Sequence, residues 1–213
     1  HCYGLAFVTL SAAAAHKIGL PAALDDIDRA WEIMESRLWD SAAGLYADEA
    51  APDWSEVGSY RGQNANMHSC EAFIEAYEAT GEAHFLDRAF DLAKLVAVDL
   101  ARKSDDLIWE HYTPNLEIDW EYNRDDPKNL YRPWGFQPGH QTEWSKPLLT
   151  LHTHRPESWL TARAGDLFDR ALDVSWDSER GGIFYGFAPE GSICDTDKYF
   201  WVQAESFAAS YRL

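Results

Sequence analysis

The sequence is short of basic residues. Its 213 residues include 18 Lys and Arg against 36 Asp and Glu, which gives a formal net charge of −18. A nucleic acid or an anionic membrane would need a basic face on the protein, so this balance argues against both partners. We interpret the acidic surplus as a surface that keeps the protein in solution.

Cysteine is also scarce. Cys2, Cys70 and Cys194 are odd in number, far apart and in no metal-binding spacing. We interpret them as reduced thiols, which predicts a cytoplasmic protein. No apolar run approaches the ~20 residues that a membrane-spanning helix needs. Phosphate-cradling glycine loops and nucleophile elbows are likewise missing from the sequence.

Aromatic residues, in contrast, are plentiful, with ten each of Trp, Tyr and Phe. They favour a large core, and the simplest reading is that they fill it. The sharper reading is a carbohydrate site, because the C–H faces of sugars pack on aromatic rings. The chain begins and stops inside helical patterns, at residues 3–10 and 202–213. We therefore expect a piece truncated at both ends, with apolar surface left exposed.

One loop motif occurs twice. WDSAAGLY at residues 39–46 recurs as WDSERGGIFY at residues 176–185, with the two Trp residues 137 positions apart. A weaker echo, DLIWE, lies between them at residues 106–110. The period is therefore about 68 residues, which is too long for common solenoids and suits a pair of long helices with their loops.

Helical periodicity runs through most of the chain. Residues 105–138 have no such period and predict short strands and loops, and residues 181–197 predict a hairpin. Helix pairs joined by alternately short and long loops describe an α/α toroid, in which the long loops build the site at one end. An ordinary helical bundle is the alternative, and the repeat favours the toroid. The predicted helices are 3–16, 22–38, 64–79, 83–103, 139–152, 157–174 and 202–213.

Three predicted inner helices, 64–79, 140–152 and 202–213, carry polar residues in or just before their first turns. Because each helix follows a long loop, we expect these ends, with His68 and His140, on one rim. His140 follows Pro138-Gly139 and should lie in a first helical turn, where the helix dipole disfavours an imidazolium. A neutral imidazole is what a proton-abstracting base requires. A histidine that only bonds a backbone group is an equally open interpretation.

Other polar patterns have simpler readings. His68 with Glu71, and His140 with Glu143, are spaced like metal ligands in helical bundles, but we favour a hydrogen bond between the Glu and either the His or a sugar hydroxyl, and we predict no metal. Asp195-Thr196-Asp197 is read as a turn and helix cap. A run of acidic residues between positions 117 and 126 could hold a glycosidase acid–base pair, but a solvated loop is the simpler interpretation. The acidic run comprises Glu117, Asp119, Glu121, Asp125 and Asp126.

Three stretches resemble the N-acylglucosamine 2-epimerase family, which includes mannose isomerase, sulfoquinovose isomerase and cellobiose 2-epimerase. They are RGQNANMHSCEAFIEAY, PWGFQPGHQTEW, and GGIFYGF followed by DTDKYFWVQAESF, spread from Arg61 to Phe207. The resemblance implies an all-α fold, the (α/α)6 barrel. Residues 1–213 would then be one truncated catalytic domain of about three helical hairpins, with short β-hairpins in the long loops.

The resemblance also implies a mechanism that uses no metal or other cofactor. Two histidines move a proton between C1 and C2 of an open-chain sugar through a cis-enediol, or remove and return it at C2. His140 matches one of that pair, and His68 matches a third histidine that opens the ring or binds a hydroxyl. The second histidine of the pair has no match here, so we expect about half a site. The expected substrate-binding residues are Asn64, Glu143, Trp201, Glu205, Tyr3 and Arg132.

The function that these residues favour is an aldose–ketose isomerase of the mannose-to-fructose type, acting on a small-molecule sugar. The Trp- and Tyr-rich loop before PGHQTEW is the feature that favours it. A 2-epimerase of N-acylglucosamine or cellobiose would use the same proton chemistry. An (α/α)6 glycoside hydrolase would need two carboxylates instead, and a non-catalytic sugar-binding module would need no histidine.

Overall fold

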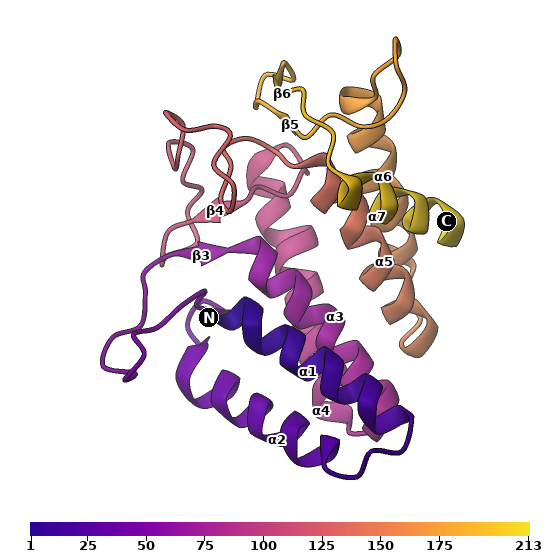
Figure 1. Ribbon diagram of the computed structural model, residues 1–213. Coiled ribbons are helices and arrows are strands. Elements are labelled where there is room, and N and C mark those ends of the chain that lie inside the picture. Colours follow the sequence, from indigo (N-terminus) through magenta and orange to yellow (C-terminus); the bar gives the residue numbers. More distant parts are fainter. The chain divides into compact units, whose positions relative to one another are not determined.

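The computed structural model describes all of residues 1–213 and is mostly helical (Figure 1). Each helix predicted from periodicity is confirmed, but two of them change pitch before they end. The helix after Ile33 continues as a π-helical turn, Met34–Leu38, and the helix after Lys94 as a π-helical and a 3₁₀ turn, Leu95–Leu100 and Ala101–Ser104. The α-helices are α1 (Cys2–Lys17), α2 (Ala23–Ile33), α3 (Gln63–Thr80), α4 (Ala83–Lys94), α5 (Pro138–His154), α6 (Ser158–Ser175) and α7 (Phe200–Arg212).

Three small antiparallel sheets, each of two strands, lie in the loops. The predicted hairpin within residues 181–197 is confirmed as β5–β6. The sheet β3–β4 pairs segments about 50 residues apart, for which the local sequence carries no signal. The strands are β1 (Trp39–Asp40), β2 (Leu45–Tyr46), β3 (Arg61–Gly62), β4 (His111–Tyr112), β5 (Gly186–Phe187) and β6 (Ile193–Asp195).

The chain divides into two compact units, His1–Val96 with His111–Glu117, and Ala97–Glu110 with Ile118–Leu213. In the first unit α1 packs along both α2 and α3, and α3 packs on α4 (Figure 1). Helix α3 ends as predicted at Gly81, which has φ 78° and whose N–H bonds the carbonyl of Tyr77. The buried side chains of this unit include Ile27, Met34, Phe73, Phe85 and Leu92.

In the second unit α5 packs on both α6 and α7. The Trp- and Tyr-rich loop of this unit, which lies within residues 105–138 and which we term the aromatic loop, folds around the buried Trp109. The ring centroid of Trp109 lies 4.6 Å from that of Trp120 and 4.9 Å from that of Phe136. Large apolar side chains remain exposed on α7, where Phe200 is 95%, Phe207 75% and Tyr211 87% exposed. None of the helices has the length and apolar character needed to cross a membrane.

The repeated WDS loops fold alike. In each, one oxygen of the Asp side chain accepts the N–H groups two and three residues further on, at 3.0–3.2 Å. The other oxygen binds a cation that precedes α3 or α7, Arg61 for Asp40 and Lys198 for Asp177. The hydrogen bond from Arg61 holds the pKa of Asp40 below its usual range, and that from Lys198 does the same for Asp177. The sequence repeat is thus a repeat of loop geometry.

A second repeated device, which we term the amide clamp, joins helices α3, α5 and α7 to the loops. In each clamp the side-chain amide of a helix residue accepts the backbone N–H of one loop residue and donates to the carbonyl of that same residue. All six hydrogen bonds are 2.7–3.1 Å long. Such a pair satisfies loop backbone groups that would otherwise be buried alone. The pairs are Asn66 with Tyr46, Gln141 with Ile108, and Gln203 with Ile183.

Candidate functional site

The first half of α5 is buried yet polar. The helix begins at Pro138, where the missing N–H of proline costs nothing. His140 therefore lies in the first turn, as predicted, and is only 7% exposed. An ordinary core helix would not bury so many hydrogen-bonding groups, because each needs a partner. The buried polar residues here are Gln137, His140, Gln141, Thr142, Glu143 and Ser145.

The imidazole of His140 pairs with a carboxylate that the sequence analysis missed. Its Nδ1 lies 2.9 Å from an oxygen of Glu110, which is only 4% exposed. An ionised carboxylate can only accept, so the hydrogen between them belongs to Nδ1. In the neutral ring Nε2 is then the basic nitrogen. The one sequence signal for Glu110 is an acidic residue directly after the apolar Ile108-Trp109 of the DLIWE echo.

Trp201 of α7 covers His140. The two ring centroids are 5.1 Å apart and the planes are inclined by 33°. Gly139 makes this contact possible, because a Cβ there would lie 2.7 Å from the Trp201 ring and from Val202. The ring of Tyr185 meets the Trp201 ring edge-on, with the two centroids 6.0 Å apart. Burial, and then the charge of Glu110, raise the pKa of the Tyr185 phenol.

Two further predicted residues lie on the same two helices. Glu143, buried, follows His140 by three positions and so shares its helix face. Glu205 of α7 forms an ion pair with Lys146 of α5. The hydroxyls of Thr142 and Ser206, 2.7 Å apart, also join these helices. A role for Glu143 and Glu205 in sugar binding stays a prediction.

In the first unit, the start of α3 holds the second predicted group. Nδ1 of His68 lies 2.9 Å from a carboxylate oxygen of Glu71, which is the His–Glu hydrogen bond that we favoured. The rings of Tyr3 and Phe7, from α1, pack on His68 with centroids 5.1 and 4.9 Å away. One turn before His68, Oδ1 of Asn64 is buried without a hydrogen-bond partner. Tyr3, Asn64 and His68 thus share one neighbourhood of this unit.

Arg132 lies in the aromatic loop of the second unit. Its guanidinium donates to the phenol oxygen of Tyr122 at 3.0 Å, and its backbone N–H donates to Asn129. The side-chain amide of Asn123 donates to the backbone carbonyl of Arg132 at 2.7 Å. These bonds hold the loop together, and a contact of Arg132 with a sugar stays a prediction.

The remaining polar patterns follow their simpler readings, with one correction. In the acidic run, Glu117, Glu121, Asp125 and Asp126 are exposed and Asp119 is half-buried, as in a solvated loop. Asp195 accepts the N–H of Asp197 in a turn, as predicted. The helix-cap reading of this segment is wrong, because α7 begins after Tyr199 and no side chain caps it. All three cysteines are free thiols.

Known proteins resemble the whole of this chain. The sequence model of the N-acylglucosamine 2-epimerase (GlcNAc 2-epimerase) family matches residues 1–213. D-mannose isomerase of Marinomonas mediterranea is 53% identical over 100% of this chain and 54% of its own length. A crystal structure of D-mannose isomerase, also 53% identical, superimposes with a TM-score of 0.98, covering 100% of this chain and 55% of the other.

A more distant structure has the same fold. Cellobiose 2-epimerase from Spirochaeta thermophila is 20% identical, with a TM-score of 0.81 over 98% of this chain and 52% of its own. The chain spans about half the length of the curated relatives it matches. The family match over every residue and the 53% identity over the full chain lead to one conclusion. The chain belongs to the N-acylglucosamine 2-epimerase family.

Proposed function

We propose that the protein is an aldose–ketose isomerase that converts mannose to fructose by histidine acid–base catalysis. The observation that supports this most directly is the buried His140, oriented through Nδ1 by Glu110 and covered by Trp201. The similarity to D-mannose isomerase of Marinomonas mediterranea supports the choice of substrate.

In the proposed reaction, Nε2 of His140 takes the proton from C2 of the open-chain sugar. The electron pair forms the C1–C2 double bond of a cis-enediol while the carbonyl oxygen on C1 gains a proton. Return of a proton to C1 and loss of the proton on the C2 hydroxyl give the ketose, so atoms and electrons balance. The base is a neutral imidazole, which is available near neutral pH.

The other predicted residues would hold the sugar. Asn64, with its buried and unpartnered Oδ1, and His68, paired with Glu71, offer hydrogen bonds to hydroxyls or to the ring oxygen. Trp201 offers an aromatic face for the sugar C–H groups. No metal or other cofactor forms part of the proposal.

The proposal includes a fold and a location. Residues 1–213 would form part of a single catalytic domain, an (α/α)6 barrel, in which α1, α3, α5 and α7 are inner helices. The packing of α1 on α3 in one unit, and of α5 on α7 in the other, supports this alternation. The exposed aromatic face of α7 would be covered by further helices. The three free thiols support a cytoplasmic location.

The proposal is tested with His140→Asn in the complete polypeptide. Asn keeps hydrogen bonds of similar reach but accepts no proton at neutral pH. We expect kcat for mannose-to-fructose conversion to fall by about 10²–10⁴-fold, with little change in substrate affinity. Exchange of the C2 hydrogen of mannose with heavy water should fall equally.

The matched control is His152→Asn, because His152 lies on the same helix and its Nδ1 lies 3.1 Å from the carbonyl oxygen of Glu157. It should retain kcat. If His140→Asn turns over within a few-fold of the wild type, the base is another residue, and His68 is the next to test. If mannose yields glucose and no fructose, the proton returns to C2 and the protein is a 2-epimerase.

A further inference from the structure

The middle amide clamp differs from the other two in what surrounds it. In all three, the clamped loop residue and the helix amide are held by two hydrogen bonds. Only in the middle clamp does a histidine, His140, directly precede the helix amide, Gln141. Only there does a glutamate, Glu110, stand two positions after the clamped residue, Ile108. The clamp that elsewhere only joins a loop to a helix therefore sets the distance between these two side chains.

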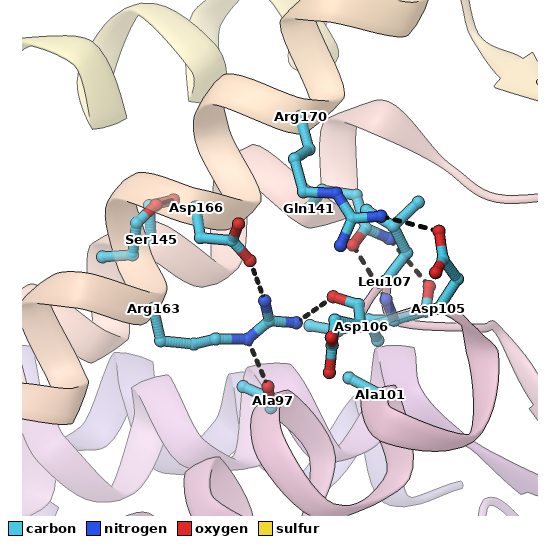
Figure 2. A network of polar contacts seen from close by, with 12 residues as sticks. Ala97, Ala101, Asp105, Asp106, Leu107, Gln141, Ser145, Arg163, Asp166 and Arg170 are labelled. Atoms are coloured by element: carbon cyan, nitrogen blue, oxygen red, sulfur yellow. Dashed lines mark hydrogen bonds and ion pairs between the residues drawn. The ribbon is translucent and has the colours of Figure 1, made fainter.

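The segment before Glu110 is also held from α6 (Figure 2). Arg163 donates to the backbone carbonyls of Ala97 and Asp106 and forms an ion pair with Asp166. Arg170 binds the carboxylate of Asp105 at 2.9 Å. Gln141 is drawn close to the same turn in Figure 2, and its side-chain amide bonds both backbone groups of Ile108. A loop fixed from two helices loses little further freedom when its glutamate meets the imidazole.

We propose that Glu110 is the positioning residue of the proposed isomerase reaction, which fixes His140 with its hydrogen on Nδ1, and that the Gln141 clamp holds Glu110 in place. This inference rests on the proposed function only for its kinetic readout. A carboxylate can accept from Nδ1–H but cannot donate, so it selects one tautomer. It also orients the ring, since Nε2 must point away from the carboxylate. Such a carboxylate acts through the histidine, as the third group that orients a catalytic base.

The charged and titratable groups around His140 come from several elements. Glu110 comes from the loop, and Glu143 lies three positions along α5. Glu205 on α7 is in an ion pair with Lys146. Tyr185, whose phenol pKa is raised by burial and then by the charge of Glu110, packs edge-on against the uncharged Trp201. Glu110 is in direct contact with the ring, 2.9 Å from Nδ1, so its neutralisation removes a negative charge adjacent to His140.

The first test is Glu110→Gln in the complete polypeptide. A glutamine can accept from Nδ1–H or donate to bare Nδ1, so both tautomers become available. We expect kcat to fall by about 10–100-fold with KM changed little. Loss of the anion disfavours the imidazolium, so the acidic limb of the pH–rate profile should move to lower pH by about one unit or more. Glu110→Asp, which keeps the charge, should keep the acidic limb in place.

Nitrogen NMR of the His140 ring gives a readout that needs no activity. In the wild type above the acidic limb we expect a protonated Nδ1 and a bare Nε2. Glu110→Gln should show a mixture of the two tautomers. Gln141→Met, which removes the clamp and leaves Glu110 in the chain, should also mix the tautomers and lower kcat by about tenfold.

Gln203→Met is the matched control, because it removes the same pair of hydrogen bonds from Ile183. It should lower Tm about as much as Gln141→Met without mixing the tautomers. If Glu110→Gln keeps the wild-type tautomer and acidic limb while His140→Asn abolishes turnover, the inference is overturned and the proposed function stands. If the tautomers mix but His140→Asn stays active, Glu110 orients the ring and the proposal that His140 is the base fails.

Discussion

At His140 two electrostatic influences act in opposite directions. The positive end of α5 disfavours an imidazolium, by about 0.3–1 kcal/mol at ordinary exposure and up to ~2 kcal/mol when partly buried. A hydrogen bond to an ionised partner contributes about 1.5–3 kcal/mol. The carboxylate of Glu110 is therefore comparable in strength to the helix end, and its range reaches higher. It decides which nitrogen carries the hydrogen, which the helix dipole alone cannot do.

His140 could be predicted from the sequence and Glu110 could not, for a physical reason. The Pro-Gly pair before His140 marks a helix start within a few residues. Glu110 lies 30 positions away and meets His140 only through tertiary structure. Residues 105–110 give no period, because they form a turn, bends and irregular backbone. A buried carboxylate after two apolar residues is a signal only once the partner is known.

Gly139 carries a prediction at the scale of one residue. A Cβ at this position would lie 2.7 Å from the Trp201 ring, so Gly139→Ala must displace Trp201 from His140. We expect a loss of about 1–3 kcal/mol in the free energy of unfolding, as for other overpacked sites. The measurement is urea denaturation of the complete polypeptide, with kcat for mannose recorded beside it.

The control for this substitution is Gly165→Ala in α6. A Cβ at Gly165 would meet nothing within 4 Å. Alanine there should raise stability by roughly 0.5–1 kcal/mol, because glycine is a poor helix former. An unchanged stability and unchanged turnover in Gly139→Ala would show that Trp201 does not need its close approach to α5.

At the scale of elements, the helices could be predicted and the connections between them could not. Amphipathic periodicity and the cap at Gly81 predicted the starts of α2, α3 and α4, and the end of α3, to within one residue. The amide clamps use single Asn and Gln residues, whose partners lie 20 to 33 positions away. The pairing of β3 with β4 could not be predicted for the same reason, because the two strands are about 50 positions apart in the sequence. The π-helical ends of α2 and α4 could not be predicted either, because a segment of 5 or 6 residues is too short to reveal a change of period.

The WDS loop makes a prediction about pH. In the folded protein the hydrogen bond from Lys198 lowers the pKa of Asp177 below its ordinary value of 3.8. A lowered pKa stabilises the fold above the unfolded pKa, and that contribution is lost as the pH falls through the folded pKa. Asp177→Asn should therefore lower Tm at pH 7, and its deficit relative to the wild type should shrink below about pH 4.

Thermal unfolding of both proteins across this pH range checks the loop prediction. The exposed Asp173, at the end of α6, supplies the control. Asp173→Asn should give a curve of Tm against pH parallel to that of the wild type. A constant deficit for Asp177→Asn at every pH would mean that its charge, and hence the Lys198 pair, contributes no stability.

At the scale of the whole molecule, charge is the dominant property. The 36 acidic residues outnumber the 18 basic ones by two to one, so at most half of them can pair one to one. Exposed ion pairs such as Arg124 with Glu121 contribute only about 0–1 kcal/mol each, so little stability is lost when salt screens them. The repulsion among the remaining carboxylates acts over longer distances and destabilises the compact state. Repulsion, rather than pairing, should therefore govern the response to salt.

The last prediction follows from that balance. Raising sodium chloride from about 10 to about 300 mM shortens the screening length from about 30 Å to under 10 Å, which removes most of the long-range repulsion. We expect Tm to rise over this range at pH 7. Choline chloride at equal ionic strength should raise Tm equally, because screening does not depend on the cation. A rise with sodium alone would indicate a bound ion. A fall in both salts would show that the ion pairs outweigh the repulsion.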